Sequence, residues 1–303
     1  MTGRPGRVCV VGSLNVDTTY HVQRIPVVGE TILAHARSVA PGGKGANQAV
    51  ASATMGSQVA MIGCVGADPE AAVVRTALID RGVNVAMLMK ASDAPTGTAI
   101  VLVDEQGENV IAVYPGANQH VDPGAVAAHL GSSPYDVVIS QLEINLPAVL
   151  SAARSKRSAT FVLNPAPMTP DVEILQEILA HTDVFVPNRV ELSRLAGRPV
   201  PVTRDELDAC VEAIGYEGVV IVTLGSDGAA LYEQGRRQPA TYLDGVPVRS
   251  VDTTGAGDTF CGVLAHGLAT HGDMTRAVRE ANDVAARSTT VQGAQIPAAL
   301  VRA

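Results

Sequence analysis

Residues 251–260 read VDTTGAGDTF. A short β-prone run, residues 246–251, leads into this stretch. Apolar residues follow it at helical spacing: Phe260, Val263, Leu264 and Leu268. The stretch is therefore predicted to join a strand to the N-terminus of a helix.

The turn itself consists of Gly255, Ala256 and Gly257. The N-terminus of a helix presents free N–H groups and the positive end of the helix dipole, and both favour a bound anion. Glycine lets the backbone approach a phosphate without a side chain in the way. The three residues are predicted to form an anion hole.

An acidic residue, Asp258, follows this turn directly. A carboxylate would repel a phosphate bound there, which suggests that it has a function, and the natural one is to take a proton from an attacking hydroxyl. This interpretation predicts phosphoryl transfer to an alcohol with Asp258 as the general base. Asp is also a common helix cap, and the local spacing leaves both interpretations open.

Composition limits the classes of protein and partner. The chain has 303 residues, 47% of them hydrophobic and 17% charged, which is enough for one large domain or two ordinary ones. Lys and Arg number 22 against 30 Asp and Glu, so the net charge is −8. An acidic chain is poorly suited to a nucleic-acid backbone, whereas ATP needs only local hydrogen-bond donors.

Cysteine usage and the N-terminus indicate the compartment. The four cysteines show no paired spacing, so they are interpreted as reduced core thiols: Cys9, Cys64, Cys210 and Cys261. Residues 1–7 are polar and basic, and no apolar signal-peptide segment follows them. No run approaches the roughly 18 apolar residues that a membrane span requires. A cytoplasmic protein with no membrane partner is expected.

Strand and helix patterns alternate along most of the chain, which predicts an α/β fold with a mostly parallel sheet and helices on both faces, a three-layer α/β/α arrangement. The predicted strands are residues 8–11, 59–65, 137–140, 160–163, 184–186 and 219–223. The predicted helices are residues 44–55, 69–81, 146–153, 172–180, 190–196 and 206–214.

Two segments break this alternation. Residues 17–40 contain strand-like runs at 18–22 and 31–34, and residues 97–115 contain two more around the turn at 104–107. Both segments have the pattern of antiparallel pairs without a helix. Together they are predicted to form a small β lid, inserted twice into a single domain that spans residues 1–303.

Polar residues follow several of the predicted strands, at the edge where ligands of parallel sheets bind. They are Asn15, Asp17, residues 42–48, Glu143, Asn188, Glu191 and residues 223–228. Such groups suit a polyhydroxylated small molecule, because each hydroxyl both donates and accepts. Taken singly, each also fits an ordinary turn or loop. Residues 42–45 are not a P-loop, because Gly45 stands where Ser or Thr is required after the lysine.

These motifs resemble the ribokinase/PfkB family of sugar kinases over nearly the whole chain. The two signature regions of the family match residues 42–48 and 252–258, and the second, of the form D-T-x-G-A-G-D, is highly specific. Residues 108–111 (ENVI) and 115–118 (PGAN) are similar to the ribokinase branch of the family.

The resemblance implies an ATP-dependent enzyme that phosphorylates the 5-hydroxyl of ribose, with Asp258 as the catalytic base. It assigns the sugar to Asn15, Asp17, Gly43, Lys44, Gly45, Ala46, Asn47, Glu143 and Asp258. It assigns ATP to Asn188, Thr223, Leu224, Gly225, Ser226, Asp227, Gly228, Gly255, Ala256, Gly257 and Asn282.

The resemblance also implies two cations. Glu191 would organise Mg²⁺ through water, and K⁺ would bind the side chain of Asp252 and the carbonyls of Thr254, Ser288, Val291 and Gly293. One departure weakens the K⁺ site, because Pro297 stands where the family pattern has a polar residue. The family further implies a homodimer that pairs through the lids.

Two other functions stay open. A nucleoside kinase or another pentose kinase of the same family would share these motifs. Aromatic residues make up only 3% of the chain and Trp is absent, which favours a small sugar, because nucleobases commonly bind by aromatic stacking. A non-catalytic, sugar-binding regulatory protein is the alternative from a different class, and the intact Asp258 turn counts against it.

Overall fold

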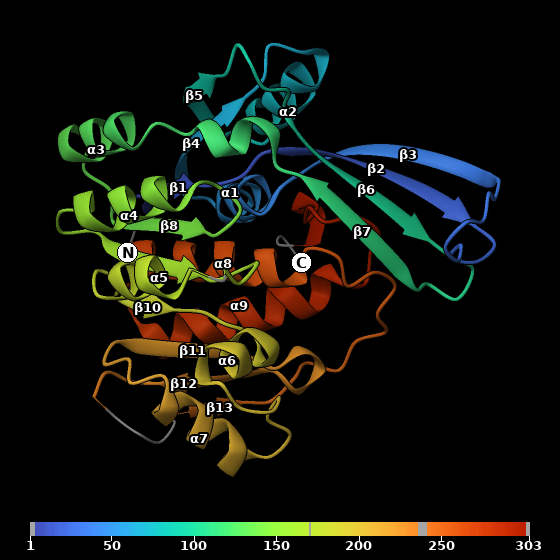
Figure 1. Cartoon of the computed structure of the whole chain (residues 1–303). Coiled ribbons are helices and arrows are strands. Elements are labelled where there is room, and N and C mark those ends of the chain that lie inside the picture. Colours follow the sequence, from blue (N-terminus) through green and yellow to red (C-terminus); the bar gives the residue numbers. More distant parts are fainter. Residues whose placement is uncertain (1–3, 170, 236–240, 301–303) are drawn as a thin grey trace.

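The computed structural model describes residues 4–169, 171–235 and 241–300 (Figure 1). The body contains β1 (Arg7–Val11), α1 (Lys44–Thr54), β4 (Gln58–Val65), α2 (Pro69–Asp80), β5 (Asn84–Lys90), η1 (Gly116–His120), α3 (Pro123–Ser132), β8 (Val137–Gln141), α4 (Leu146–Ser155), β9 (Thr160–Asn164), α5 (Val172–Leu179), β10 (Val184–Phe185), α6 (Arg189–Ala196), α7 (Arg204–Ala213), β11 (Val219–Thr223), η2 (Gly225–Asp227), β12 (Ala229–Tyr232), β13 (Thr241–Leu243), α8 (Ala256–Thr270), α9 (Met274–Ser288) and η3 (Ala298–Leu300). The lid contains β2 (Asn15–Val22), β3 (Ala34–Gly42), β6 (Gly97–Val103) and β7 (Asn109–Tyr114).

The main sheet has nine strands among the described residues, in the order β13-β12-β11-β10-β9-β8-β1-β4-β5. Every neighbouring pair from β11 to β5 is parallel. Strand β12 pairs antiparallel with β11, and the edge strand β13 pairs antiparallel with β12. The predicted α/β fold with a mostly parallel sheet is confirmed.

Helices cover both faces of this sheet, so the three-layer arrangement is confirmed as well. Successive strand residues point to opposite faces, and β1 accordingly contributes Val8 and Val10 to one core and Cys9 and Val11 to the other. Helices α1, α2, α8 and α9 pack on the first face, and α3 to α7 pack on the second. Because both faces are buried, the central strands carry mostly apolar residues on both faces.

The strand order reverses beside β1. Strands β4 and β5 extend the sheet on one side of β1, and β8 to β11 extend it on the other. Ligands of open α/β sheets bind outside the carboxyl ends of the strands at such a reversal. Strands β1 and β8 end at Val11 and Gln141, so the segments that carry Asn15 and Glu143 lie at this point.

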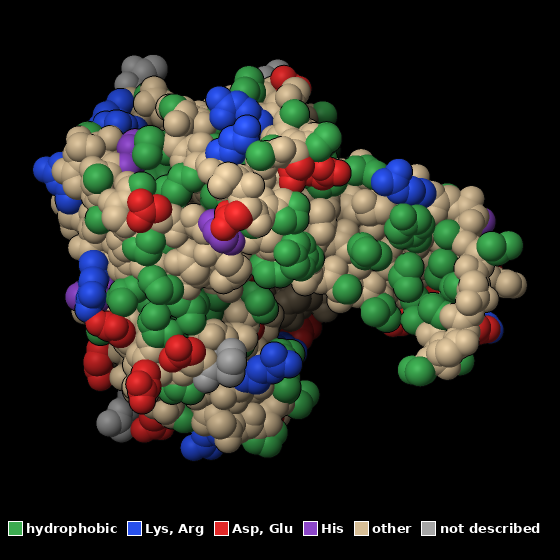
Figure 2. Space-filling model, turned by 45° about the horizontal axis from the view of Figure 1, so that its top comes forward, with side chains coloured by type: hydrophobic (Ala, Val, Ile, Leu, Met, Phe, Trp, Pro, Cys, Tyr) green, Lys and Arg blue, Asp and Glu red, His purple; other side chains and the backbone are tan. Residues whose placement is uncertain are grey.

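The lid is a second sheet with the order β3-β2-β6-β7. Its outer pairs are antiparallel, as predicted, and β2 pairs with β6 in parallel. The lid sheet projects from the body (Figure 1), and Figure 2 shows hydrophobic side chains spread over one of its faces. The lid strands fall on the two predicted insertions apart from their ends, while the extent of the single domain, residues 1–303, stays a prediction.

One lid strand lies elsewhere than predicted. The expected strand at Thr31–Ala34 is wrong, because β3 starts only where that run ends. A turn precedes it, in which the Glu30 N–H donates to the Val27 carbonyl at 3.1 Å. The pairing with β2, in a register that joins Asn15 to Gly42, selects the true strand. Its own Ala-, Arg- and Ser-containing sequence has little intrinsic β-propensity.

The β-prone run at 246–251 is a second wrong prediction, because the structure leaves it outside any strand. The main sheet ends with β13, and Pro247 has no N–H to donate to a further ladder. The run instead forms a wall of a pocket, to which Val246, Pro247, Val248 and Ser250 contribute.

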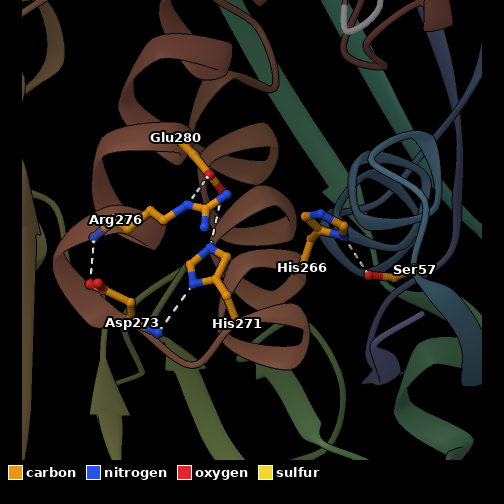
Figure 3. Close-up of polar contacts among 6 residues, drawn as sticks. All are labelled: Ser57, His266, His271, Asp273, Arg276 and Glu280. Carbon is orange, nitrogen blue, oxygen red and sulfur yellow. Dashed lines mark hydrogen bonds and ion pairs between the residues drawn. The ribbon is translucent and has the colours of Figure 1, made fainter. Parts of the chain in front are cut away.

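Polar contacts fix the end of α8 against its neighbours (Figure 3). His271 Nε2 lies 3.3 Å from Glu280 Oε2 on α9, and the Asp273 N–H donates to His271 Nδ1 at 3.1 Å. Since Nδ1 accepts, the neutral ring carries its proton on Nε2 and donates to Glu280. On the same helix, His266 Nδ1 lies 2.8 Å from Ser57 Oγ. These contacts help to set the orientation of α8, whose first turn carries Asp258.

All four cysteines are buried and free, as their spacing predicts. Cys9, Cys64 and Cys210 pack in the core below α3 to α7, and Cys261 packs in the core on the other face. Within the described part of the chain, no helix combines the length and the apolar character needed to cross a lipid bilayer.

Candidate active site

Two adjacent pockets lie along the carboxyl ends of the strands. The smaller one, called here the catalytic pocket, has a volume of about 120 Å³ and lies between α1, β9, α6 and α8, where its lining includes Lys44, Asn188, Glu191 and Asp258. The larger one, the α8–α9 pocket, has a volume of about 490 Å³. Thr223 and Gly257 line both pockets, which therefore share a wall at this point.

The glycine turn closes one end of the catalytic pocket. Gly255 lines this pocket, is the N-cap of α8 and has a φ of 74°, a conformation that favours glycine. A Cβ on Gly255 would lie 2.3 Å from the carbonyl oxygen of Ala294, whereas a Cβ on Gly257 would meet nothing within 4 Å. Ala256 and Gly257 line the α8–α9 pocket. The predicted anion hole thus lies at a helix N-terminus that faces open space.

Asp258 does not cap α8, so the structure decides against that alternative. The N-cap makes no side-chain hydrogen bond. The Asp258 carboxylate instead accepts from two side chains of α1, with Asn47 Nδ2 at 3.1 Å from Oδ2 and Gln48 Nε2 at 3.2 Å from Oδ1. The residue is only 7% exposed and lines the catalytic pocket. This geometry fits a general base that is held in place and open on one side.

Lys44 and Glu143 bring further charges to the same point. Glu143 Oε2 accepts from Ser13 Oγ at 2.5 Å and from the Lys44 N–H at 3.1 Å, which ties the ends of β1, α1 and β8 together. The charge of Asp258, with those of Glu143 and Glu191, raises the pKa of Lys44 against the opposing effect of burial. Lys44 therefore keeps its positive charge among three carboxylates.

Asp17 lies where the lid meets the body. Its Oδ1 is buried and has no hydrogen-bond partner in the described residues. Burial, together with the charges of Glu143 and Asp258, raises the pKa of Asp17 to about 6. A Cβ on Gly42 would lie 2.1 Å from Asp17 Oδ2, so only glycine leaves room for this carboxylate. An unpaired buried acceptor of this kind suits a ligand that donates hydroxyl hydrogens.

Asn188 and Glu191 form the capping box of α6. Asn188 Oδ1 accepts from the Glu191 N–H at 2.8 Å, and Glu191 Oε2 accepts from the Asn188 N–H at 2.8 Å. Burial raises the pKa of Glu191, although the Asn188 N–H and Lys44 oppose this. No group of three His, Cys, Asp or Glu in the described chain could hold a metal alone. A Mg²⁺ ion here would take most ligands from phosphates and water, as this ion usually does.

The residues predicted for ATP lie in three places, and two of these residues, Asn188 and Gly255, line the catalytic pocket. Thr223, Gly225, Ser226, Gly228, Ala256, Gly257 and Asn282 line the α8–α9 pocket. Leu224 and Asp227 instead line a neighbouring pocket, where Asp227 Oδ2 accepts from Arg189 at 2.6 Å. Asn282 Nδ2 donates to the Asp244 carbonyl at 2.9 Å, which fixes its amide and leaves its oxygen for other contacts. Residues 223–228 do form a hairpin turn between β11 and β12, and four of them line the pocket as well.

Asp252 joins the two loops that the resemblance assigns to K⁺. Its Oδ1 accepts from the Thr254 N–H and its Oδ2 from the Gly293 N–H, both at 2.9 Å. Burial opposes ionisation, but these N–H groups outweigh it and lower the pKa of Asp252. An ionised carboxylate beside the backbone of residues 288–293 is compatible with a monovalent cation held by oxygen atoms.

Comparison with known proteins identifies the family. Residues 6–300 match the model of the pfkB family of carbohydrate kinases. The chain belongs to this family. A ribokinase from Haemophilus influenzae is 35% identical over 94% of this chain and 93% of its own length. A deoxyribokinase from Salmonella typhi is 34% identical over 95% of this chain and 94% of its own length.

Solved structures of pfkB-family kinases agree with this assignment. The ribokinase of Arabidopsis thaliana, solved in complex with ribose and ATP, has a TM-score of 0.84 and 31% identity, with 98% of this chain and 97% of that chain covered. The fold of this carbohydrate kinase, with its mostly parallel sheet and small β lid, is thus the ribokinase-like fold.

Sequence reasoning gave no role to Asn118, although its motif contributed to the family resemblance. Asn118 Nδ2 donates to Asn15 Oδ1 at 2.8 Å and to the Leu14 carbonyl at 3.2 Å, while its Oδ1 accepts from the Leu14 N–H at 2.9 Å. The Asn15 amide is thereby oriented with its NH₂ group available to a ligand. Only the fold brings these residues, 103 positions apart, into contact.

Proposed function

We propose that this carbohydrate kinase transfers the γ-phosphoryl group of ATP to the 5-hydroxyl of D-ribose and releases ribose 5-phosphate and ADP. The observation that carries the proposal is the Asp258 carboxylate, held by α1 at the junction of the catalytic pocket and the glycine turn. Relatives of nearly the same length are ribokinases, and the Arabidopsis thaliana ribokinase was solved with ribose and ATP.

The sugar would bind under the lid. Asp17 Oδ1 offers an unpaired acceptor and Asn15 an oriented NH₂ group, both at the root of the lid. The start of α1 would contact the sugar through its N-cap Gly43 and through Gly45, Ala46 and Asn47 of its first turn. Lys44 and Glu143 lie beside these residues. This ring of acceptors and donors would orient the 5-hydroxyl toward Asp258, and orientation of this kind contributes much of the catalysis of phosphoryl transfer.

The transfer step balances without a covalent enzyme intermediate. The ribose O5–P bond forms as the bond between the γ-phosphorus and its bridging oxygen breaks, and the proton of O5 passes to the Asp258 carboxylate. The N–H groups of Gly255, Ala256 and Gly257 and the ammonium of Lys44 would stabilise the charge on the phosphoryl oxygens. Asn188 and Glu191 would hold Mg²⁺ through water beside ATP, and the ion would neutralise phosphate charge.

A panel of substrates tests the proposed function. Relatives named for ribose and for deoxyribose are 35% and 34% identical, so identity does not separate these two sugars. We expect the highest kcat/KM with ribose among ribose, deoxyribose, adenosine and fructose 6-phosphate, measured as sugar-dependent ADP release. Preference for adenosine would indicate the nucleoside kinase, and no release with any acceptor would favour the regulatory sugar-binding protein.

Asp17 links sugar affinity to pH. The pKa of Asp17 in the folded chain, about 6, lies above its ordinary value of 3.8. Ionisation of Asp17 therefore lowers the free energy of unfolding as pH rises from 3.8 to about 6. Sugar hydroxyls donate to the ionised form, and the KM for ribose is expected to rise as pH falls below about 6. Asp17→Asn should abolish this pH dependence, weaken ribose binding and raise the thermal midpoint at pH 8 without sugar. An unchanged pH dependence of KM in that variant would contradict the assignment.

The K⁺ site is proposed on the joined loops around Asp252. A bound monovalent cation would order the segment that packs against Gly255, since the Gly255 position contacts Ala294. We expect kcat to be several-fold higher in K⁺ than in Na⁺, and Asp252→Asn to remove the difference. Equal rates in K⁺, Na⁺ and a bulky organic cation would exclude a functional ion site, which Pro297 already weakens in comparison with the family pattern.

A homodimer through the lids is proposed on the exposed apolar surface of the lid sheet. All six residues of β7 are exposed, and Val110, Ile111, Val113 and Tyr114 are each 50–56% exposed. Such an apolar edge strand needs cover to avoid uncontrolled pairing. Sedimentation at micromolar concentration should show a dimer, and Ile111→Lys should convert it to a monomer. A wild-type chain that sediments only as a monomer would contradict this proposal.

A reducing compartment such as the cytoplasm is also proposed, because all four cysteines are buried and free.

A further inference from the structure

A chain of buried side-chain amides leads from the main sheet to Asp258. Gln48 on α1 is fully buried, and its Nε2 donates to Asp258 Oδ1 and to Asn164 Oδ1, each at 3.2 Å. Its Oε1 accepts from Gln141 Nε2 at 2.6 Å. Asn164 Nδ2 in turn donates to the Val186 carbonyl at 3.0 Å. The network therefore connects the ends of β8, β9 and β10 with the first turn of α8.

The hydrogen bonds allow one orientation of these amides. Two acceptors, the Asp258 carboxylate and the Asn164 carbonyl oxygen, face the same end of Gln48, so that end must be the NH₂ group. The other end is then an acceptor, and Gln141 must turn its own NH₂ group toward it. The charge of the carboxylate thus sets the direction of the whole network.

This orientation leaves one polar atom without a partner. Gln141 Oε1 is buried and makes no hydrogen bond among the described residues. It faces Gly12, where a Cβ would lie only 2.1 Å from it. An unpaired buried acceptor destabilises a fold by about 1–3 kcal/mol. Turning the Gln141 amide over would put two oxygens face to face at Gln48, and the structure retains the unpaired oxygen instead.

We infer that Gln48, oriented by Gln141 and Asn164, is a positioning residue that holds the Asp258 carboxylate in the orientation required for proton transfer. Gln48 does not line the catalytic pocket and has no exposed surface, so it acts through Asp258 and not on the sugar. It occupies Oδ1 while Asn47 occupies Oδ2, which fixes the plane of the carboxylate and leaves the remaining lone pairs for the substrate hydroxyl. This inference rests on the proposed role of Asp258.

The test combines Gln48→Met with Asp258→Asn. Gln48→Met keeps the length of the side chain but removes the donor, and it should lower kcat about 10–100-fold, the range found when residues that orient metal ligands are removed. The KM values for ribose and ATP should change little. In the Asp258→Asn background the same substitution should have almost no further effect on kcat, because residues that act as a unit are not additive.

A pH profile separates positioning from a general structural defect. Removal of a donor disfavours the ionised carboxylate, so the acid-side fall of kcat should move to higher pH in Gln48→Met. Ser52→Ala is a matched control, since Ser52 is fully buried one turn further along α1 and its Oγ has no partner in the described chain. This control should keep the wild-type kcat and pH profile. If Gln48→Met does not fold, Gln141→Met serves as the second variant: it removes the donor that orients Gln48, together with the unpaired Gln141 oxygen, and it should lower kcat while the KM values change little.

Two outcomes would overturn the inference. One is a Gln48→Met enzyme with wild-type kcat and pH profile. The other is a loss of kcat that is fully additive with that of Asp258→Asn, which would show that Gln48 acts independently of the base. If Asp258→Asn itself retains its turnover, the proposed mechanism fails, and that result is distinguishable from a failure of Gln48 alone.

Discussion

Asp258→Asn is expected to lower kcat by about 10²–10⁴-fold, the usual effect of removing a general base. The substitution keeps the size of the side chain but removes the carboxylate that would accept the ribose proton. Because the carboxylate makes its hydrogen bonds with Asn47 and Gln48, ribose and ATP should still bind. Steady-state kinetics and direct titration of both ligands measure the two effects separately.

The stability of this variant needs its own measurement. The oxygen of the introduced amide can still accept from one of the two α1 side chains, whereas its NH₂ group faces the other donor. We therefore expect a loss of about 1–3 kcal/mol at most, which leaves the protein folded at the assay temperature. Asp283→Asn is the matched control, because Asp283 forms an exposed ion pair with Arg287 and should keep its full turnover. A folded Asp258→Asn protein that binds both ligands and retains most of its turnover would contradict the mechanism.

Gly255→Ala is the second substitution with a large expected effect. A left-handed residue with a Cβ is strained by roughly 1–2 kcal/mol, and the new Cβ would also lie 2.3 Å from the Ala294 carbonyl oxygen. Backbone must move to relieve this contact, and the anion turn would move with it. A misplacement of about 1 Å can lower a rate about 10²-fold. We expect a loss of kcat of that order and a lower thermal midpoint.

Two other glycines separate strain from function. Gly82 has a φ of 77° and open space around its Cβ position, so Gly82→Ala should show the strain alone, with a lower thermal midpoint and unchanged kcat. Gly257 has no positive φ and no atom within 4 Å of its Cβ position, yet it lines both pockets. Gly257→Ala should keep its stability and raise the KM for ATP. If Gly255→Ala behaves like Gly82→Ala, the turn does not position the phosphate.

Much of the fold follows from local sequence. The apolar runs of β1, β4, β8, β9 and β11 predict buried parallel strands because both faces of the sheet are covered. Strands β5, β12 and β13 and helices α3 and α9 were not predicted. Strands β12 and β13 have only 4 and 3 residues, and α3 is rich in Ala. Helix α9 was missed although its buried residues Ala277, Val278, Ala281 and Val284 recur at helical spacing. Short and Ala-rich segments carry weak patterns, and tertiary packing selects their structure.

The candidate site likewise combines residues that local sequence predicts with contacts that only the folded chain contains. The glycine turn, Asp258 and the residues after each strand were predictable, because a helix N-terminus and a strand end have local signals. The sequence alone left the function of Asp258 open between a cap and a base. Hydrogen bonds from Asn47 and Gln48, 211 and 210 positions away, decided against the cap. No local pattern contains a contact of that length.

The sequence by itself therefore determined the class of fold, the family and most of the residues that approach the site. Only the tertiary structure decided which segment pairs as β3, that residues 246–251 form a pocket wall, and how Asn118 and Gln48 orient Asn15 and Asp258. Hydrophobic periodicity and turn chemistry act over a few residues and can be recognised in the chain. The direction of a buried amide depends on every acceptor around it, and these acceptors come from strands and helices that only folding brings together.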